Sequence, residues 1–226
     1  MGILDVLTGM MLPRQCEICG RDLLAGEHTL CVHCVAALPV CREPEADLRA
    51  SRITRGAAVG RVYPWLSYTH DNDVARIVRL GKYNNRPDIF ARLGDMLGRH
   101  LVAIGCLDGV DALIPVPMHW FKRMRRGYNQ AELIAMAISA RTGIPVLRGA
   151  LKAVRAHHRQ AGSGREERAA NVRGSFRATR DLRGMHVAVV DDILTTGATV
   201  SAAVDALAER CPRLISVFTL AAAPAQ

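Results

Sequence analysis

The segment Met185-His-Val-Ala-Val-Val-Asp-Asp-Ile-Leu-Thr-Thr-Gly-Ala-Thr-Val200 joins an apolar run, an acidic pair, a polar loop and an amphipathic stretch. Residues 187–190 form a continuous apolar run rich in valine, the pattern of a parallel strand buried on both faces. Residues 198–210 carry apolar side chains at helical spacing, namely Val200, Ala203, Val204 and Leu207. The segment therefore predicts a strand, a loop and a helix of an open α/β sheet.

Polar groups gather where this strand is expected to end. Asp191 and Asp192 follow the apolar run directly, and residues 193–197 form a short loop ahead of the helix. Open α/β folds bind ligands at this carboxyl edge of the sheet. Gly197 lets the backbone approach an anion, and the helix N-terminus supplies unpaired N–H groups and a dipole that favours phosphate. The hydroxyl groups nearby belong to Thr195, Thr196 and Thr199.

This combination predicts a site for a sugar phosphate. Two adjacent carboxylates are poor ligands for phosphate but good hydrogen-bond acceptors for sugar hydroxyls. We therefore expect Asp191 and Asp192 to bind ribose hydroxyls, and the loop of residues 195–199 to bind a 5′-phosphate. Two other interpretations of the acidic pair stay open at this point, a helix cap and a simple magnesium site.

A cysteine motif near the start of the chain predicts a metal site. Cys16, Cys19, Cys31 and Cys34 follow the pattern C-x2-C, eleven residues, C-x2-C. A two-residue gap lets both thiolates of a tight turn face one metal ion, and two such turns complete a tetrahedral zinc site. Two disulfides or an iron–sulfur centre are the alternatives, and the lack of a secretion signal argues against disulfides. We predict a structural Zn²⁺ ion that holds this small segment together.

The other cysteines and the nearby histidines have different expected roles. Cys41 is either a spare ligand or a packed thiol, whereas Cys106 and Cys211 lie in apolar contexts that favour the core. His28 and His33 lie inside the cysteine motif, but four thiolates already fill a tetrahedral site. We therefore expect both histidines in exposed loops.

Composition narrows the class of protein and of partner. The chain has 226 residues, half of them apolar, which suffices for a folded core and excludes a wholly disordered protein. Its formal charge of +9 favours a polyanionic partner: nucleic acid, a phosphorylated metabolite or an acidic protein. Aromatic residues make up only 4%, which disfavours a protein built mainly on base-stacking platforms. Because no targeting signal or membrane-length apolar run is found, we expect a cytoplasmic protein without a membrane partner.

The opening segment also resembles a known motif. Residues 187–199 are similar to the 5-phosphoribosyl 1-pyrophosphate (PRPP) binding motif of type I phosphoribosyltransferases. Other stretches, and the cysteine-rich ribbon, resemble the competence protein ComF family of phosphoribosyltransferase-like proteins. These stretches are Ile114-Pro-Val-Pro117, Arg123, Arg126-Gly-Tyr-Asn-Gln-Ala-Glu-Leu133, Gln160, Arg165-Glu-Glu-Arg168-Ala-Ala-Asn171 and Lys82-Tyr83. One departure is Tyr128, where the family more often has phenylalanine.

The resemblance implies a set of binding and catalytic residues. It implies that PRPP, together with Mg²⁺, contacts the acidic pair and the loop after it. The implied PRPP-binding residues are Asp191, Asp192, Thr195, Thr196, Gly197, Ala198 and Thr199. The implied catalytic residues are Arg123, Arg126 and Arg168, with Arg123 or Arg126 on the diphosphate side.

Several basic residues keep more than one interpretation. Lys122 and Arg125 lie in the same run as the implied arginines but have no support from the resemblance, and a solvated helix face is the alternative for the whole run. Lys82 and Tyr83 are candidates to reach the pyrophosphate, and a plain surface position is equally open for both.

The expected fold class is α/β, a type I phosphoribosyltransferase-like fold with a mainly parallel sheet flanked by helices. We expect a zinc ribbon at residues 1–44, a linker at 45–56 and the phosphoribosyltransferase-like domain at 57–226. Residues 152–177 are polar and basic, and the resemblance implies a flexible catalytic loop that closes over PRPP. Further strands are expected at 57–68, 111–117 and 214–225, and further helices at 74–81, 89–104 and 129–141.

Two functions of different classes follow from the resemblance. One is phosphoribosyl transfer from PRPP with release of pyrophosphate, linked by the family to natural competence and DNA uptake. The alternative is a non-catalytic accessory module that senses PRPP and binds single-stranded DNA, beside a helicase-type competence protein. Because one fold hosts many functions, the fold alone does not decide between them.

Overall fold

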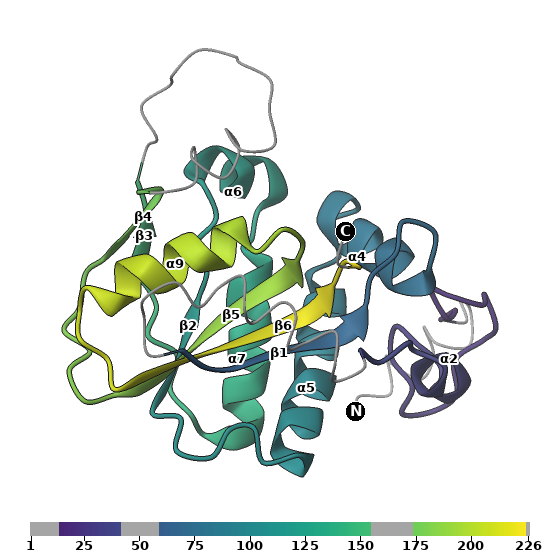
Figure 1. Ribbon diagram of the computed structural model, residues 1–226. Helices are drawn as coiled ribbons and strands as arrows, with labels where there is room; N and C mark the ends of the chain where they lie inside the picture. Colours follow the sequence, from purple (N-terminus) through teal and green to yellow (C-terminus); the bar gives the residue numbers. More distant parts are fainter. Residues whose placement is uncertain (1–13, 42–58, 155–173, 225–226) are drawn as a thin grey trace, which may run out of the picture.

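A four-stranded parallel sheet in the order β1-β6-β5-β2 forms the centre of the structure (Figure 1). The structure is a computed structural model that describes residues 14–41, 59–154 and 174–224. The strands of the sheet are β1 (Val59–Ser67), β2 (Ala112–Pro115), β5 (His186–Leu194) and β6 (Leu214–Ala222). The parallel sheet expected from the valine-rich segment is confirmed.

The central strand β5 runs further than its apolar run. The sequence predicts an end at Val190, but Asp191 pairs with Thr219 and Leu194 with Ala222 of β6. The acidic pair therefore lies within the last residues of the strand rather than after it. The extension depends on β6, whose apolar residues offer backbone partners up to Ala222, and such pairing is invisible in the local sequence of β5.

Helices cover both faces of the sheet. On one face lie α5 (Pro87–Ala103) and α7 (Gln130–Thr142), and on the other lies α9 (Ala198–Ala208) (Figure 1). Successive residues of a strand point to opposite faces. Ala188 and Val190 accordingly belong to the core beneath α5 and α7, whereas Val187 and Val189 belong to the core beneath α9. This two-sided burial explains the uninterrupted apolar run.

Helices α5 and α7 pack closely because α5 carries glycine at the contact. A Cβ atom added to Gly94 would lie 2.9 Å from the Ala137 Cβ and 2.9 Å from the Ile134 Cα of α7. Backbone atoms cannot yield to such a contact, so only glycine lets the two helices approach this far. The contact fixes α7, whose N-terminal residues line the site described below.

Smaller elements surround the carboxyl edge of the sheet. They are α4 (Asp73–Tyr83), α6 (Trp120–Arg126) and a two-stranded antiparallel sheet of β3 (Leu151–Ala153) and β4 (Phe176–Ala178). β3 and β4 enclose most of the predicted catalytic loop. Residues 155–173 of that loop, with Arg168, lie outside the described residues.

The N-terminal segment packs against the first strand and helices of the main domain. Residues 39–41 run antiparallel to β1, where the Cys41 N–H donates to the Trp65 carbonyl over 2.8 Å and the Ser67 N–H to the Pro39 carbonyl over 2.8 Å. Cys16, Leu30 and Cys31 are buried in the same apolar cluster as Trp65. The segment also holds the short helix α2 (Val32–Ala36). The expected linker, residues 45–56, lies outside the described residues.

Two expectations about individual residues need comment. Cys106 is buried as expected, but the core position expected for Cys211 is wrong, because Cys211 is exposed in the turn after α9 with a φ of 53°. An apolar neighbourhood in sequence does not bury a residue that follows the end of a helix. In the described parts of the chain, no helix combines the length and apolarity needed to cross a membrane.

Candidate functional site

A cavity of about 1090 Å³ opens at the carboxyl edge of the sheet. Its walls come from the end of β5, the loop after β2, the end of α4, helix α6, the start of α9 and the ends of β3 and β4. The edge at which parallel sheets commonly bind ligands is therefore hollow here.

The acidic pair lines this cavity. The Asp191 Oδ1 accepts a hydrogen bond from the Asp192 N–H over 2.8 Å, and the Asp192 Oδ1 accepts one from the Ile193 N–H over 2.8 Å. Both side chains are only partly exposed. Burial, together with the neighbouring charge of Asp192, raises the pKa of Asp191 to about 8. Each carboxyl group retains oxygen atoms that can accept hydrogen bonds from hydroxyls.

Lys82, whose role was open from the sequence, contacts this pair. Its Nζ lies 2.6 Å from the Asp192 Oδ2, and the side chains are 20% and 16% exposed. Lys82 is in the last turn of α4, and the amphipathic pattern that buries Val74, Ile77 and Val78 brings it to the cavity. A local sequence pattern predicts the helix but not which distant strand its end meets.

The loop between β5 and α9 presents groups suited to an anion. Thr195 and Thr199 line the cavity. Gly197, at a φ of 80°, forms the N-terminal boundary of α9, and no side chain caps the helix there. The Ala198 N–H lies 3.5 Å from the Thr196 hydroxyl. Uncapped N–H groups at a helix N-terminus bind phosphate well, but Thr196, Gly197 and Ala198 are not among the lining residues, so the binding role of residues 195–199 stays a prediction.

Three cations of α6 lie at the cavity, but they are not the set expected from the sequence. Lys122, Arg125 and Arg126 line it, and the Arg126 guanidinium lies 5.7 Å from the centre of the Tyr83 ring. Arg123 is not among the lining residues and lies 3.8 Å from Glu132 of α7. Each residue of a helix turns by about 100°, so Arg123 lies about 100° from Lys122 and about 160° from Arg125 around the helix axis. Lys122 and Arg125, rather than Arg123, therefore line the cavity beside Arg126.

The base of the predicted catalytic loop also borders the cavity. Ala153 and Val154 on one side, and Ser175 and Phe176 on the other, are lining residues. The intervening residues, which include Arg168, are not described, so the predicted role of Arg168 stays a prediction.

Asn129 and Gln130 are two lining residues that sequence reasoning assigned no role. The Asn129 side chain is 7% exposed; its Nδ2 donates to the Val116 carbonyl over 2.9 Å, and its Oδ1 accepts from the Ala131 N–H over 3.2 Å. Asn129 thus caps α7 and holds the loop after β2. Gln130 is 2% exposed, and its Nε2 has no hydrogen-bond partner within the described parts of the chain. Asparagine directly before a helical pattern was the available signal for the cap.

The four cysteines of the N-terminal motif form a cluster that fits a zinc ion. Their sulfur atoms lie within 4.8 Å of one another, and the Cys19 and Cys31 sulfurs are 3.8 Å apart. A tetrahedron with Zn–S bonds of about 2.3 Å has edges of about 3.8 Å, whereas a disulfide would need about 2.05 Å. Four converging thiol groups are the donor set of a structural zinc site. Cys41 is outside this cluster and packs against the apolar core, which decides between its two interpretations.

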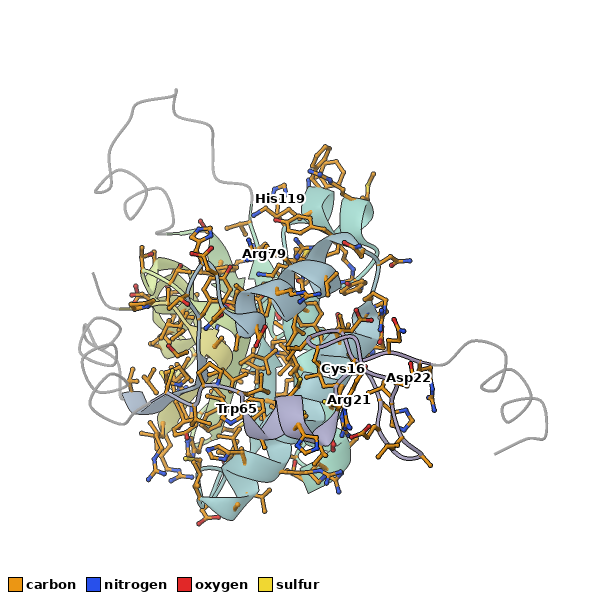
Figure 2. The ribbon with its side chains drawn as sticks, turned by 90° about the vertical axis from the view of Figure 1, so that its right-hand side faces the viewer. Cys16, Arg21, Asp22, Trp65, Arg79 and His119 are labelled. Carbon is orange, nitrogen blue, oxygen red and sulfur yellow. The ribbon has the colours of Figure 1, made fainter. Side chains whose placement is uncertain are left out.

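Hydrogen bonds to sulfur favour the thiolate form of Cys31, whereas burial and hydrogen bonds with the neighbouring cysteines raise the pKa of Cys34. The Cys31 N–H donates to the Cys16 sulfur and the Cys34 N–H to the Cys31 sulfur, each over 3.4 Å. Although burial acts to raise it, hydrogen bonds from the Cys34 N–H and the Arg21 guanidinium lower the pKa of the Cys31 thiol to about 6. Figure 2 shows Cys16 and Arg21 close together in the N-terminal cysteine segment. His119, which borders the cavity, lies well away from both. The metal cluster and the cavity are therefore separate sites.

Comparisons with known proteins identify a known domain and two relatives of the chain. A family model described as the phosphoribosyl transferase domain matches residues 125–226. Competence protein F of Haemophilus influenzae is 36% identical over 94 residues, which are 40% of this chain and 41% of that protein. The DNA utilization protein YhgH of Salmonella typhimurium is 24% identical over 222 residues, which are 93% of this chain and 98% of that protein.

The chain thus aligns with about two fifths of the length of the Haemophilus protein and with almost all of the Salmonella protein. The crystal structure of TT1426 from Thermus thermophilus aligns with 59% of this chain and 83% of its own, with a TM-score of 0.36 and 16% identity. The domain match and the two relatives, on a parallel α/β fold with an N-terminal cysteine cluster, show that the chain is similar to competence protein F and to other phosphoribosyltransferase-like proteins.

Proposed function

We propose that the cavity binds PRPP with Mg²⁺ and that the protein transfers its phosphoribosyl group with release of pyrophosphate. One observation carries the proposal: a cavity of about 1090 Å³ has carboxylates and an anion-binding loop on one wall and three cations on another. A ribose that carries a phosphate and a diphosphate needs both kinds of group: hydrogen-bond acceptors for its hydroxyls, and hydrogen-bond donors and cations for its phosphate oxygens.

Each part of the site takes one part of the ligand. Asp191 and Asp192 accept hydrogen bonds from the ribose hydroxyls, and the loop of residues 195–199 binds the 5′-phosphate. We assign Arg126, with Lys122 and Arg125 beside it, to the diphosphate that extends from C1, because all three side chains line the cavity. When bound with PRPP, Mg²⁺ would supply positive charge that stabilises the diphosphate leaving group.

The chemistry follows from this placement. The bond between C1 and the diphosphate oxygen breaks, both bonding electrons leave with pyrophosphate, and the sugar passes through an oxocarbenium-like state. A nucleophile then forms a bond to C1 and loses its proton. The cations of α6 stabilise the developing charge on the leaving group.

Turnover of PRPP tests the enzymatic part of this proposal. Purified full-length protein is incubated with PRPP and Mg²⁺, with and without nucleobases, and pyrophosphate is measured. We expect pyrophosphate release that depends on both the protein and an acceptor. Binding of PRPP without any release would instead favour the sensing module over the enzyme.

A second candidate function, binding of single-stranded DNA, rests on the surface of α6. Trp120, Phe121 and Met124 are 51%, 62% and 73% exposed; the two aromatic residues directly precede Lys122 and Arg123, and Met124 lies between Arg123 and Arg125. Exposed aromatic rings beside cations are the combination on which bases stack while phosphates are neutralised. Few aromatic residues are present in the chain, but these two are exposed on the same helix as the cations, which is the arrangement that base stacking requires. The names of two relatives, competence protein F and DNA utilization protein YhgH, also support a proposal that involves DNA.

We expect the double change Trp120→Ala with Phe121→Ala to weaken binding of a fluorescent oligothymidylate roughly tenfold or more, since each stacked base contributes about 1–3 kcal/mol. Leu24→Ala is a matched control, because Leu24 is 63% exposed on the ribbon. Wild-type affinity should fall steeply with salt in anisotropy measurements. Salt-insensitive binding, or no binding at low salt, would contradict the proposal that α6 binds single-stranded DNA.

A further inference from the structure

An ion pair joins two walls of the cavity. Lys82 lies in the last turn of α4, and Asp192 lies near the end of β5, so the contact of 2.6 Å between Nζ and Oδ2 links elements far apart in the sequence. Both side chains are largely withdrawn from water, at 20% and 16% exposure. Pairs this protected are less screened than surface pairs and hold a defined geometry better.

The end of α4 is itself fixed by its neighbours. The Tyr128 hydroxyl donates a hydrogen bond to the carbonyl of Gly81, the residue before Lys82. A Cβ atom on Gly81 would lie 2.5 Å from the Phe90 Cε2 of α5, so that ring fills the space beside it. On the other side of Lys82, the Tyr83 ring lies under the Arg126 guanidinium. Lys82 is therefore presented to the cavity from a constrained turn.

The hydroxyl group of Tyr128 contributes to this constraint. Phenylalanine, expected more often at this position, would keep the ring contact with Phe90, whose centroid is 6.2 Å away, but would lose the hydrogen bond to Gly81. In this chain the hydroxyl ties the start of the α7 region to the turn that carries Lys82.

The acidic pair needs such a partner to receive an anionic sugar. Asp191 and Asp192 are adjacent and partly buried, and an unpaired carboxylate there would repel both its neighbour and the ligand. The Asp192 Oδ1 is used by the Ile193 N–H and its Oδ2 by Lys82, so the carboxylate plane is fixed by two contacts. Its remaining lone pairs keep a constant direction for a hydroxyl donor.

We infer that Lys82 is a positioning residue that acts through Asp192, orienting its carboxylate to accept the ribose hydroxyls of a phosphoribosyl ligand. The inference rests on the proposed PRPP site and goes beyond it by assigning Lys82 to the ribose rather than to the diphosphate. A direct contact of Lys82 with the diphosphate is the competing role, and the two roles predict different ligand profiles.

The test compares three ligands by calorimetry: PRPP with Mg²⁺, ribose 5-phosphate, and pyrophosphate with Mg²⁺. Lys82→Met should weaken PRPP and ribose 5-phosphate roughly tenfold to a hundredfold, the size of a hydrogen bond involving a charged group. Its effect on pyrophosphate should be much smaller. Lys82→Arg should recover much of the lost affinity, and Arg79→Met, which removes a cation of α4 that does not line the cavity, should bind all three ligands like the wild type.

A second measurement needs no ligand. Lys82→Met should lower the melting temperature by leaving the Asp192 carboxylate unpaired, and adding Asp192→Asn should restore part of the loss. Equal weakening of PRPP and pyrophosphate with ribose 5-phosphate unchanged would overturn the inference in favour of a diphosphate contact. Unchanged binding of all three ligands would overturn it as well. Failure of the wild type to bind PRPP would instead overturn the proposed function, and the role of Lys82 with it.

Discussion

Replacement of both Asp191 and Asp192 by asparagine is expected to weaken PRPP binding by at least roughly a hundredfold. Each carboxylate accepts a hydroxyl of the ribose in the proposed complex, and a hydrogen bond to a charged group contributes about 1.5–3 kcal/mol. Asparagine preserves the size of the side chain but removes the charge and one acceptor oxygen. Calorimetric titration with PRPP and Mg²⁺ measures the change.

The double variant should fold. The raised pKa of Asp191, at about 8, means that the unfolded chain loses this proton at a lower pH than the folded protein does. Asp191 therefore costs stability progressively as the pH rises from about 4 to about 8, and a neutral amide escapes this cost. Asp205→Asn, on the exposed side of α9, is the control for loss of a carboxylate. Unchanged PRPP affinity in the double variant would show that the ribose lies elsewhere.

The same titration should depend on pH through Asp191. Because burial and the charge of Asp192 raise its pKa to about 8, a carboxylate that accepts a ribose hydroxyl must first release a proton below that pH. Affinity should rise by up to about tenfold per unit between pH 6 and pH 8 and level off above. Asp191→Asn should lack this component, which separates it from titration of the ligand phosphates.

Removal of zinc is expected to have the second large effect, on stability. We expect about one Zn²⁺ per chain in metal analysis and its loss in Cys16→Ser, since four thiolates hold the ion. Structural zinc in small ribbons contributes about 10–16 kcal/mol of binding free energy, which is also folding free energy. Cys16 and Cys31 share an apolar cluster with Trp65, so the melting temperature of the whole protein should fall, not only that of the ribbon.

The docking of the ribbon supports this expectation. Arg86, at the start of α5, forms ion pairs with both Glu17 and Asp88, and the Arg76 guanidinium donates to the Ile18 carbonyl over 3.0 Å. Cys211→Ser is the control, because Cys211 is exposed and outside the cluster. A fully folded, zinc-free protein with an unchanged melting temperature would refute the structural role of the metal.

Much of the fold could be predicted because its signals are local. The valine-rich run of residues 187–190 predicts a strand buried on both faces, and the spacing of Val200, Val204 and Leu207 predicts the helix after it. The spacing of the cysteines likewise predicts a cluster, since two tight turns place their thiolates within reach of one ion. Periodicity and turn geometry need no knowledge of distant residues.

The parts that could not be predicted depend on packing between distant elements. β5 continues to Leu194 because β6 supplies partners, and Lys82 reaches Asp192 because α4 packs beside that end of the sheet. The choice among the cations of α6 depends on how that helix is rotated: its phase gives the cavity Lys122 rather than Arg123. In each case the sequence shows which residue is present but not which distant residue or cavity it meets in the fold.

The central claim is that the edge of the sheet binds PRPP, and direct titration of the wild-type protein with PRPP and Mg²⁺ tests it best. The account predicts saturable binding of one PRPP per chain, displaced by ribose 5-phosphate and by pyrophosphate and lost when Asp191 and Asp192 are both asparagine. Absence of binding in the wild type, or binding that survives in the double variant, would contradict it.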